Sequence, residues 1–185
     1  MNLVIPAREH IAEYVAALKK GWSPTTVNPE KAAREELAQI ELDTPAFLAS
    51  MTDRSPNDRF ITLPDGSQHA RLPGICRWMW DDGFCGSINF RWKPGTPELP
   101  PTVLGHIGYS MVPWKWGRGY AKEALRLILM EARNEGLPYV ELTTDPDNIA
   151  SQRVIRANGG VFVEEFKEPE AYGGKIGFRF RISLG

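Results

Sequence analysis

The stretch GHIGYSMVPWKWGRGYAKEAL, residues 105–125, decides the fold because it predicts a strand, a tight turn and a helix in immediate succession. We expect a strand over residues 103–112 that stops at Pro113, since proline has no backbone N–H to donate. Gly117 and Gly119 then allow a tight turn directly before the helix. Such a unit directs several backbone N–H groups and the positive end of a helix dipole at one point, which suits a phosphate or pyrophosphate.

The helix after the turn has the most regular pattern in the chain. Its apolar residues recur at intervals of three and four, which indicates the buried face of an amphipathic helix. They are Ala121, Ala124, Leu125, Ile128, Leu129 and Ala132. Gly136 and Pro138 predict the end of this helix.

Further helices and strands are expected on both sides of this unit. The expected helices span residues 7–20, 29–40, 45–51 and 148–157, with Asn28 as the cap of the second. The expected strands span residues 75–80, 84–92, 139–143, 161–166 and 176–182, and Asp82-Gly83 joins the first two as a hairpin. Residues 55–73, which are polar and contain Pro56 and Pro64, predict a loop with one short strand at 60–63.

Composition argues against nucleic-acid and membrane partners. The chain has 185 residues with 22 Lys and Arg against 23 Asp and Glu, so no broad electrostatic field would attract nucleic acid or an anionic membrane. No apolar stretch reaches the roughly 20 residues of a membrane span, which makes the cytoplasm the expected location. Cys76 and Cys85 lie several rungs apart on the expected hairpin, so we expect no disulfide between them.

Two glycines by themselves fit a plain tight turn as well as a phosphate site. Other phosphate motifs fit poorly, because the Gly-Lys-Ser/Thr ending of a P-loop is absent and the three-glycine dinucleotide fingerprint is incomplete. A nucleotide-phosphate binder stays open as an alternative.

Two blocks of sequence resemble the GNAT superfamily of N-acetyltransferases. The first, GHIGYS through Pro113 and then WGRGYAKEAL from Trp116, is similar to its acetyl-CoA motif of Arg or Gln, two variable residues, Gly, one variable residue and Gly or Ala. Trp116 occupies the Arg or Gln position here. The second block, DNIAS from Asp147 and NGGVF from Asn158, is similar to the second signature of the superfamily. The resemblance covers roughly residues 102–166.

The resemblance implies an α/β fold of the GNAT type, with a mixed central β-sheet flanked by helices, in a single domain over residues 1–185. Residues 1–70 would form a helical N-terminal part and residues 71–185 the sheet and cofactor-binding core. It also implies acetyl-CoA as co-substrate and no metal. The residues expected to contact the cofactor are Met111 and Val112 at the pantetheine arm, Trp116, Gly117, Arg118, Gly119, Tyr120, Ala121 and Lys122 at the pyrophosphate, and Asn148 and Ser151, for which helix capping is the alternative.

The resemblance also implies catalytic groups near the strand before the turn, where an amide near Val112 would stabilise the oxyanion of the tetrahedral intermediate. His106 is the group on that strand that titrates near neutrality, so it is the candidate general base, with a hydrogen-bonded structural role as the alternative. Glu141 and Asp145 could act through water or form caps and salt bridges. Ile155 occupies the position where the superfamily often has a Tyr that acts as general acid. Ser151 or solvent would therefore protonate the departing coenzyme A thiolate.

The acceptor is expected to be a primary amine of a small molecule or of a protein N-terminus. Aromatic residues near the expected cofactor gap would be core or would line an acceptor pocket; they are Trp78, Trp80, Phe90, Trp92, Trp114 and Trp116. Glu35 and Glu36 could attract a cationic amine, with a solvated helix face as the alternative. A non-catalytic acyl-CoA-binding regulatory module is the alternative function, and a homodimer is left open.

Overall fold

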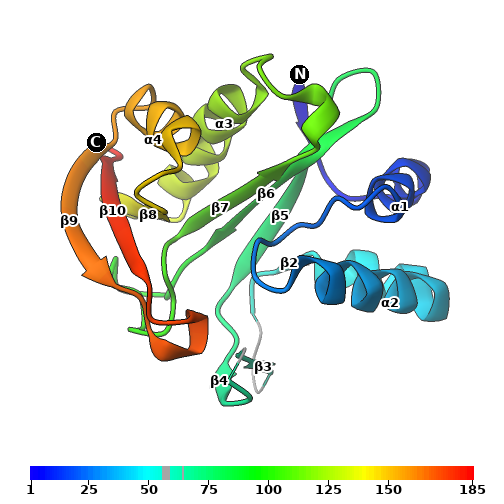
Figure 1. The fold of residues 1–185 in the computed structure, drawn as a ribbon, viewed down its shortest axis with the longest axis horizontal. Helices are drawn as coiled ribbons and strands as arrows, with labels where there is room; N and C mark the ends of the chain where they lie inside the picture. Colours follow the sequence, from blue (N-terminus) through cyan, green and yellow to red (C-terminus); the bar gives the residue numbers. More distant parts are fainter. Residues whose placement is uncertain (56–58, 64) are drawn as a thin grey trace. The chain divides into compact units, whose positions relative to one another are not determined.

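The computed structural model of the protein describes residues 1–55, 59–63 and 65–185, and it divides into two compact units (Figure 1). The first unit comprises Met1–Arg54, Gly74–Asn89 and Tyr109–Ala124, and the second comprises Ser55–Pro73, Phe90–Gly108 and Leu125–Gly185. Within the loop expected over residues 55–73, residues 56–58 and 64, among them Pro56 and Pro64, lie outside the described residues.

A β-sheet forms the frame of the first unit. Its order is β1-β5-β6-β7, and β2 pairs with β5 beside this path. The strands are β1 Asn2–Val4, β2 Thr52–Asp53, β5 Gly74–Trp80, β6 Phe84–Arg91 and β7 Ile107–Met111. The last residues of β6 and the first of β7 belong to the second unit. At the β5–β6 turn, Asp82 and Gly83 adopt φ values of 46° and 101°, which confirms the expected hairpin.

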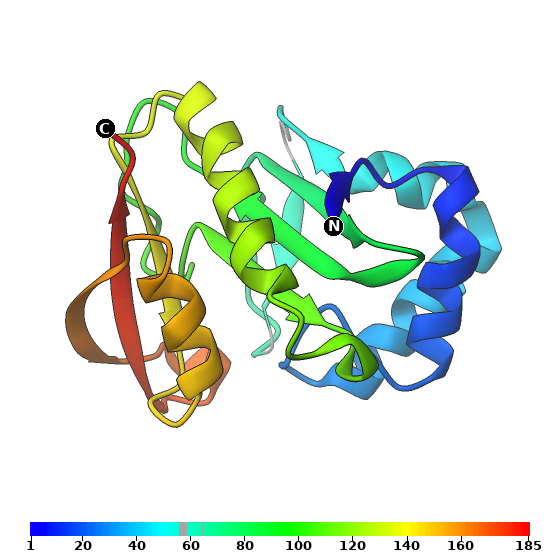
Figure 2. The same cartoon turned by 90° about the horizontal axis from the view of Figure 1, so that it is seen from above.

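Helices α1 and α2 cover one face of this sheet (Figures 1 and 2). Helix α1 spans Ile11–Lys19 and follows the 3-10 turn η1 at Arg8–His10, as the apolar spacing predicted. Aromatic rings fill the space between helix and sheet. The Tyr14 ring stacks on Trp78 with centroids 4.4 Å apart and meets the edge of Phe84 at 5.2 Å. The apolar side of α1 is therefore fixed by packing against β5 and β6.

Helix α2, Pro29–Ser50, contains a kink at the place where the sequence predicted a break between two separate helices. Asp43 leaves the helical region, with φ −155° and ψ 87°, and its Oδ1 accepts a hydrogen bond of 2.9 Å from the Ala46 N–H. Pro45 fits here because the first turn after a break needs no intrahelical N–H donor. The third expected helix is thus the second segment of α2. The capping prediction for Asn28 was wrong, because Asn28 adopts φ 46° instead of the extended conformation of a capping residue, and its side chain makes no capping bond to the described start of α2.

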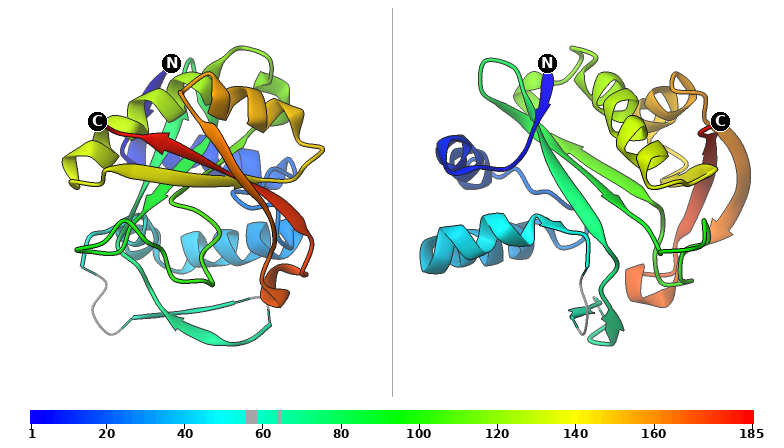
Figure 3. Two further views of the ribbon diagram at one scale, coloured as in Figure 1. Left: turned by 90° about the vertical axis from the view of Figure 1, so that its left-hand side faces the viewer. Right: turned by 180° about the vertical axis from the view of Figure 1, so that it is seen from behind.

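The second unit is built on an antiparallel sheet of order β8-β10-β9 (Figure 3). Strands β8 Tyr139–Thr144, β9 Val161–Lys167 and β10 Ile176–Ser183 and helix α4 Ile149–Arg156 lie close to the expected ranges. The 3-10 turn η3, Glu170–Tyr172, was not expected. Strands β3 Phe60–Thr62 and β4 Gln68–Ala70 pair with each other, so the expected loop contains β4 in addition to the short strand that the sequence predicted.

Helix α3, Tyr120–Asn134, follows the glycine turn and continues from the first unit into the second. Its predicted apolar stripe is buried: Ala124, Leu125, Ile128 and Ala132 have no exposed surface. The stripe therefore anchors the helix whose first turn borders the candidate phosphate site.

Strand β7 is shorter than the strand expected over residues 103–112. The Val103 N–H donates to the Pro100 carbonyl at 2.9 Å, and the His106 N–H donates to the Glu141 carbonyl at 2.7 Å. The first bond closes a turn and the second links His106 to β8, so the strand itself begins at Ile107, although the His106 carbonyl still accepts from the Arg91 N–H of β6 at 2.8 Å.

The chain thus has the mixed α/β fold of strands and flanking helices that the sequence predicted. Cys76 and Cys85 are buried free thiols. Over the described ranges, no helix is both long and apolar enough to span a bilayer. The boundaries of a single domain over 1–185 stay a prediction.

Candidate functional site

The glycine turn of the first unit has the backbone geometry that an anion site needs. Chain direction changes through η2, Pro113–Lys115, and then through Gly117 and Gly119, which adopt φ values of 76° and 77°. Residues with side chains rarely adopt this left-handed region, so glycine is required for conformation. A Cβ added at either glycine would meet nothing within 4 Å, so the surface beside the turn is open to a ligand.

The first turn of α3 supplies the donors. Gly119 precedes the helix, and its carbonyl accepts from the Glu123 N–H at 3.1 Å. The N–H groups of Gly119, Tyr120 and Ala121 precede the fourth helical residue and therefore have no intrahelical acceptor. They point along the helix axis at the positive end of its dipole, beside the exposed Arg118 side chain. This arrangement suits a pyrophosphate.

Tyr120 also ties the turn to the β5–β6 hairpin. Its hydroxyl donates a hydrogen bond to the Asp81 carboxylate. This bond raises the pKa of Tyr120 and lowers the pKa of Asp81, because it favours the neutral phenol and the ionised carboxylate. Asp81 therefore stays an acceptor throughout the neutral range.

The end of β7 offers one amide to a thioester. The Val112 N–H is already used, since it donates to the Cys85 carbonyl at 3.0 Å. Successive residues of a strand direct their N–H groups to opposite edges, so the Met111 N–H points away from β6. The Met111 carbonyl accepts a bond of 3.3 Å from Trp116 Nε1. The candidate oxyanion donor is therefore Met111 rather than Val112.

His106, in the second unit, is bound on three sides. Its N–H donates to the Glu141 carbonyl at 2.7 Å, its Nδ1 accepts from the Glu141 N–H at 2.9 Å, and its carbonyl accepts from the Arg91 N–H at 2.8 Å. The ring is 1% exposed. Burial lowers the pKa of His106 to about 4, although the Glu141 carboxylate acts in the opposite direction. Because Nδ1 already accepts a bond, the neutral ring carries its proton on Nε2, and these contacts favour the structural alternative over the general base.

The two carboxylates considered beside His106 form ion pairs. Glu141 lies 3.1 Å from Arg179 and 2.7 Å from Arg181, and Asp145 lies 2.7 Å from Lys175. Their observed partners match the salt-bridge alternative for both residues.

The Asn148 block of the second unit shows the expected cap. Asn148 Oδ1 accepts from the Ser151 N–H at 3.0 Å, which closes the first turn of α4. Ile155 is buried, and a Cβ at Gly160 would lie 2.3 Å from its Cγ2, so the NGG turn is shaped by close packing against this side chain. The structure leaves the cofactor contacts of Asn148 and Ser151 as predictions.

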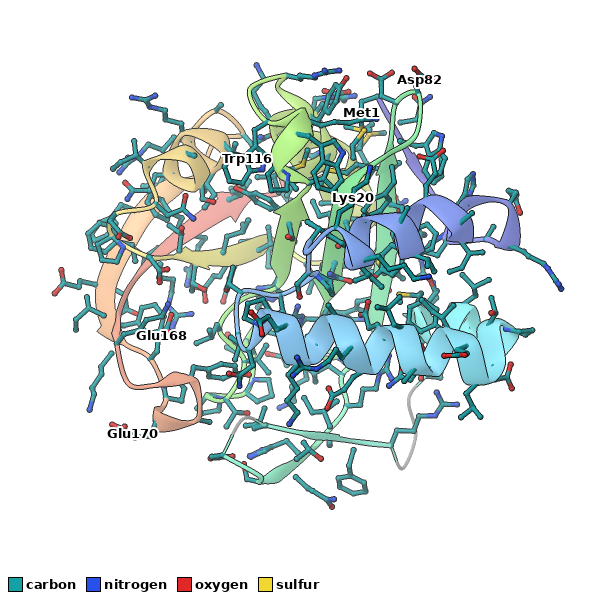
Figure 4. The ribbon with its side chains drawn as sticks, turned by 45° about the vertical axis from the view of Figure 1, so that its right-hand side comes forward. Met1, Lys20, Asp82, Trp116, Glu168 and Glu170 are labelled. Carbon is teal, nitrogen blue, oxygen red and sulfur yellow. The ribbon has the colours of Figure 1, made fainter. Side chains whose placement is uncertain are left out.

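The aromatic residues separate into core and surface. Trp78, Phe90 and Trp92 are buried, whereas Trp114 and Trp116 are 46% and 66% exposed. The ammonium of Lys20 lies 5.3 Å from the centre of the Trp114 ring. Lys20 and Trp116 are both labelled in Figure 4. The sixth ring, Trp80, is half-buried, with its centroid 4.6 Å from that of His10, so Trp114 and Trp116 are the exposed rings of the six.

Sequence reasoning missed the environment of Glu36. It expected a solvated face, but Glu36 Oε2 accepts a 2.5 Å hydrogen bond from the Tyr14 hydroxyl, and burial raises the pKa of Glu36 to about 7. Glu35, by contrast, is exposed and pairs with Lys31 at 3.8 Å. The signal was present, since Glu36 lies on the same helical face as the buried Ala33 and Ile40.

The predicted site residues fall into separate parts of the chain. Met111, Val112 and the turn through Lys122 belong to the first unit, and His106, Asn148 and Ser151 belong to the second. Among the residues that the structure describes, no cluster of His, Cys, Asp and Glu could hold a metal ion.

Comparisons with known proteins indicate a family and a fold for this chain. A family model described as an acetyltransferase (GNAT) domain matches residues 22–161. No curated protein matches the chain at a significant level. Among solved structures, RimJ of Mycobacterium smegmatis in complex with CoA-disulfide is 18% identical, with a TM-score of 0.63 over 98% of this chain and 80% of that chain.

Two further structures have the same fold. RimL, a ribosomal-protein alpha-N-acetyltransferase in complex with coenzyme A, is 14% identical, with a TM-score of 0.61 over 98% of this chain and 92% of that chain. The spermidine N-acetyltransferase SpeG from Vibrio cholerae is 11% identical, with a TM-score of 0.57 over 100% of this chain and 95% of that chain. At these identities the likeness concerns the fold, which is the GNAT fold that the sequence predicted.

Proposed function

Because the chain belongs to the GNAT acetyltransferase family, we propose that it transfers the acetyl group of acetyl-CoA to a primary amine. The observation that supports this most directly is the turn at Gly117 and Gly119, whose left-handed backbone places the first amides of α3 at an open surface. The proposed pyrophosphate ligands are these amides together with Arg118.

The reaction needs a nucleophile, an oxyanion donor and a route for one proton. The neutral amine attacks the thioester carbonyl, an N–C bond forms, and the C–S bond breaks to release coenzyme A. We propose the Met111 N–H as the donor that stabilises the tetrahedral oxyanion, since this amide is directed away from β6. The proton lost by the amine passes through solvent, and Ser151 or solvent returns a proton to the thiolate.

His106 enters this proposal as a positioning residue. Its bonds to Glu141 link the start of β7 to β8, and its ring is neutral at physiological pH. A deprotonated amine can instead come from the small neutral fraction in solution, which a well-placed site can select.

The acceptor is proposed to be a small-molecule amine or the N-terminus of a peptide. The related structures include enzymes named for ribosomal proteins and for spermidine, so the fold accepts both classes. We propose the cytoplasm as the compartment of the protein. A homodimer is proposed as the alternative to a monomer.

Binding and turnover test the proposal separately. Titration calorimetry with coenzyme A measures cofactor binding, and release of free thiol from acetyl-CoA with a panel of amines and N-terminal peptides measures transfer. Gly119→Asp is expected to lose coenzyme A binding, because a side chain is strained at φ 77° and its negative charge would face the pyrophosphate. Unchanged affinity in this variant would disprove the site.

A non-catalytic acyl-CoA-binding module is the second candidate, favoured by the buried neutral His106 and by Ile155 in the position of the acidic Tyr. Tight coenzyme A binding without thiol release for any amine would support the module. A thermal shift with ATP and none with acetyl-CoA would instead support a nucleotide-phosphate binder.

A further inference from the structure

Lys115 lies two residues before Gly117, yet its ammonium is directed at the β5–β6 hairpin. Its Nζ donates to the backbone carbonyls of Asp81 at 2.8 Å, Asp82 at 3.0 Å and Gly83 at 3.3 Å. An ammonium has three N–H donors, and its acceptors, these carbonyls and Cys85 Sγ, belong to the hairpin.

The hairpin turn is shaped to receive this cation. Asp82 and Gly83 both have positive φ, and the Asp81 N–H donates to the Gly83 carbonyl at 3.0 Å. Successive carbonyl oxygens therefore converge on one point instead of alternating as they do along a strand. Cys85 Sγ, 3.5 Å from the same Nζ, lies beside them.

A second link joins the other side of the glycine turn to the same hairpin. The Tyr120 hydroxyl donates to the Asp81 carboxylate. Lys115 before the turn and Tyr120 after it thus both bind the hairpin, and the glycines between them are fixed at both ends.

We propose that Lys115 and Tyr120 are positioning residues that hold the Gly117–Gly119 turn on the β5–β6 hairpin, so that its amides are preorganised for the coenzyme A pyrophosphate. This inference rests on the proposed function. A flexible glycine turn would lose conformational freedom on binding, and holding it in place beforehand removes that cost from the binding free energy. Lys115 would then support cofactor affinity without contacting a phosphate.

The test compares acetyl-CoA with S-acetylpantetheine, a cofactor fragment without phosphates. In Lys115→Met and in Tyr120→Phe, the KM for acetyl-CoA is expected to rise about tenfold, with kcat changed by less than about twofold, as loss of charge-assisted hydrogen bonds predicts. The KM for S-acetylpantetheine should not change. Lys31→Met, an exposed substitution on α2, is the control and should leave all values at the wild-type level.

Two readouts separate positioning from direct phosphate contact and from loss of fold. Removal of a phosphate-binding cation would weaken the salt dependence of coenzyme A affinity, whereas loss of a positioning residue leaves that dependence unchanged. Amide hydrogen exchange of the cofactor-free variants should accelerate at the Trp116 and Glu123 N–H groups, which bond to the Pro113 and Gly119 carbonyls on either side of the turn, while the α1–α2 helices keep wild-type protection.

The outcomes are distinct. If the wild type does not bind coenzyme A, the proposed function fails and this proposal fails with it. If the wild type binds but Lys115→Met and Tyr120→Phe bind equally well, or if the salt dependence falls, the positioning role alone is refuted.

Discussion

Glu36→Gln is expected to change the pH dependence of stability by a defined amount. Burial raises the folded-state pKa of Glu36 from its ordinary 4.5 to about 7, although the hydrogen bond from Tyr14 acts to lower it. Because the folded state holds the proton more tightly, the contribution of Glu36 is fully present below pH 4.5 and is lost as pH rises through about 7. The difference between these pKa values, at about 1.4 kcal/mol per unit, corresponds to about 3 kcal/mol.

The assay is urea unfolding followed by tryptophan fluorescence at pH values from 4 to 8. The free energy of unfolding of the wild type minus that of Glu36→Gln should fall by about 3 kcal/mol between pH 4.5 and 7.5. Taking the difference is necessary because the wild-type profile also contains His106, whose folded pKa of about 4 gives the opposite trend below pH 6.5.

Glu35→Gln is the matched control. It removes a carboxylate from the next position of α2, where the side chain is 60% exposed and its Lys31 partner is 3.8 Å away. An exposed pair of this kind contributes about 0–1 kcal/mol, so its difference from the wild type should stay small at every pH. A constant wild-type minus Glu36→Gln difference across the range would refute the reasoning about burial.

Two other substitutions test the second unit. His106→Asn keeps an acceptor near the Nδ1 position, so we expect it to abolish the loss of stability of about 3 kcal/mol that the wild type shows as pH falls from 6.5 to 4. The limb of the pH–activity profile near neutrality should stay at its wild-type pH. A shift of this limb in the variant would restore His106 as the general base. Asn148→Ala removes the cap of α4 and should lower the free energy of unfolding by about 1 kcal/mol. It should also raise the KM for acetyl-CoA if Asn148 contacts the cofactor. A loss of stability with an unchanged KM would show that Asn148 acts as a helix cap alone.

Local chemistry made much of the fold predictable. The spacing in α1 and α3, the stop at Pro113 and the two glycines at 117 and 119 all act through a few neighbouring residues, and the structure has these elements in the expected places. The break inside α2 also agrees with the sequence, since Pro45 is disfavoured in a helix interior and was expected to begin a separate helix.

The chemical state of the side chains was not predictable in this way. From the sequence, His106 was a candidate general base with a structural role as the alternative, and Glu36 was expected either to attract an amine or to lie on a solvated face. Residue type alone left the burial of these two side chains open. The structure buries His106 beside Glu141 and Glu36 beside Tyr14, and this burial lowers the pKa of His106 and raises the pKa of Glu36.

The sequence by itself therefore determined the local backbone of the proposed pyrophosphate turn, because glycine conformation and the first turn of a helix are local properties of the chain. Only the tertiary structure decided how that turn is held and which groups are free to react. Lys115 meets Asp81, and His106 meets Glu141, across more than 30 residues of chain. Folding alone brings such residues within hydrogen-bonding distance.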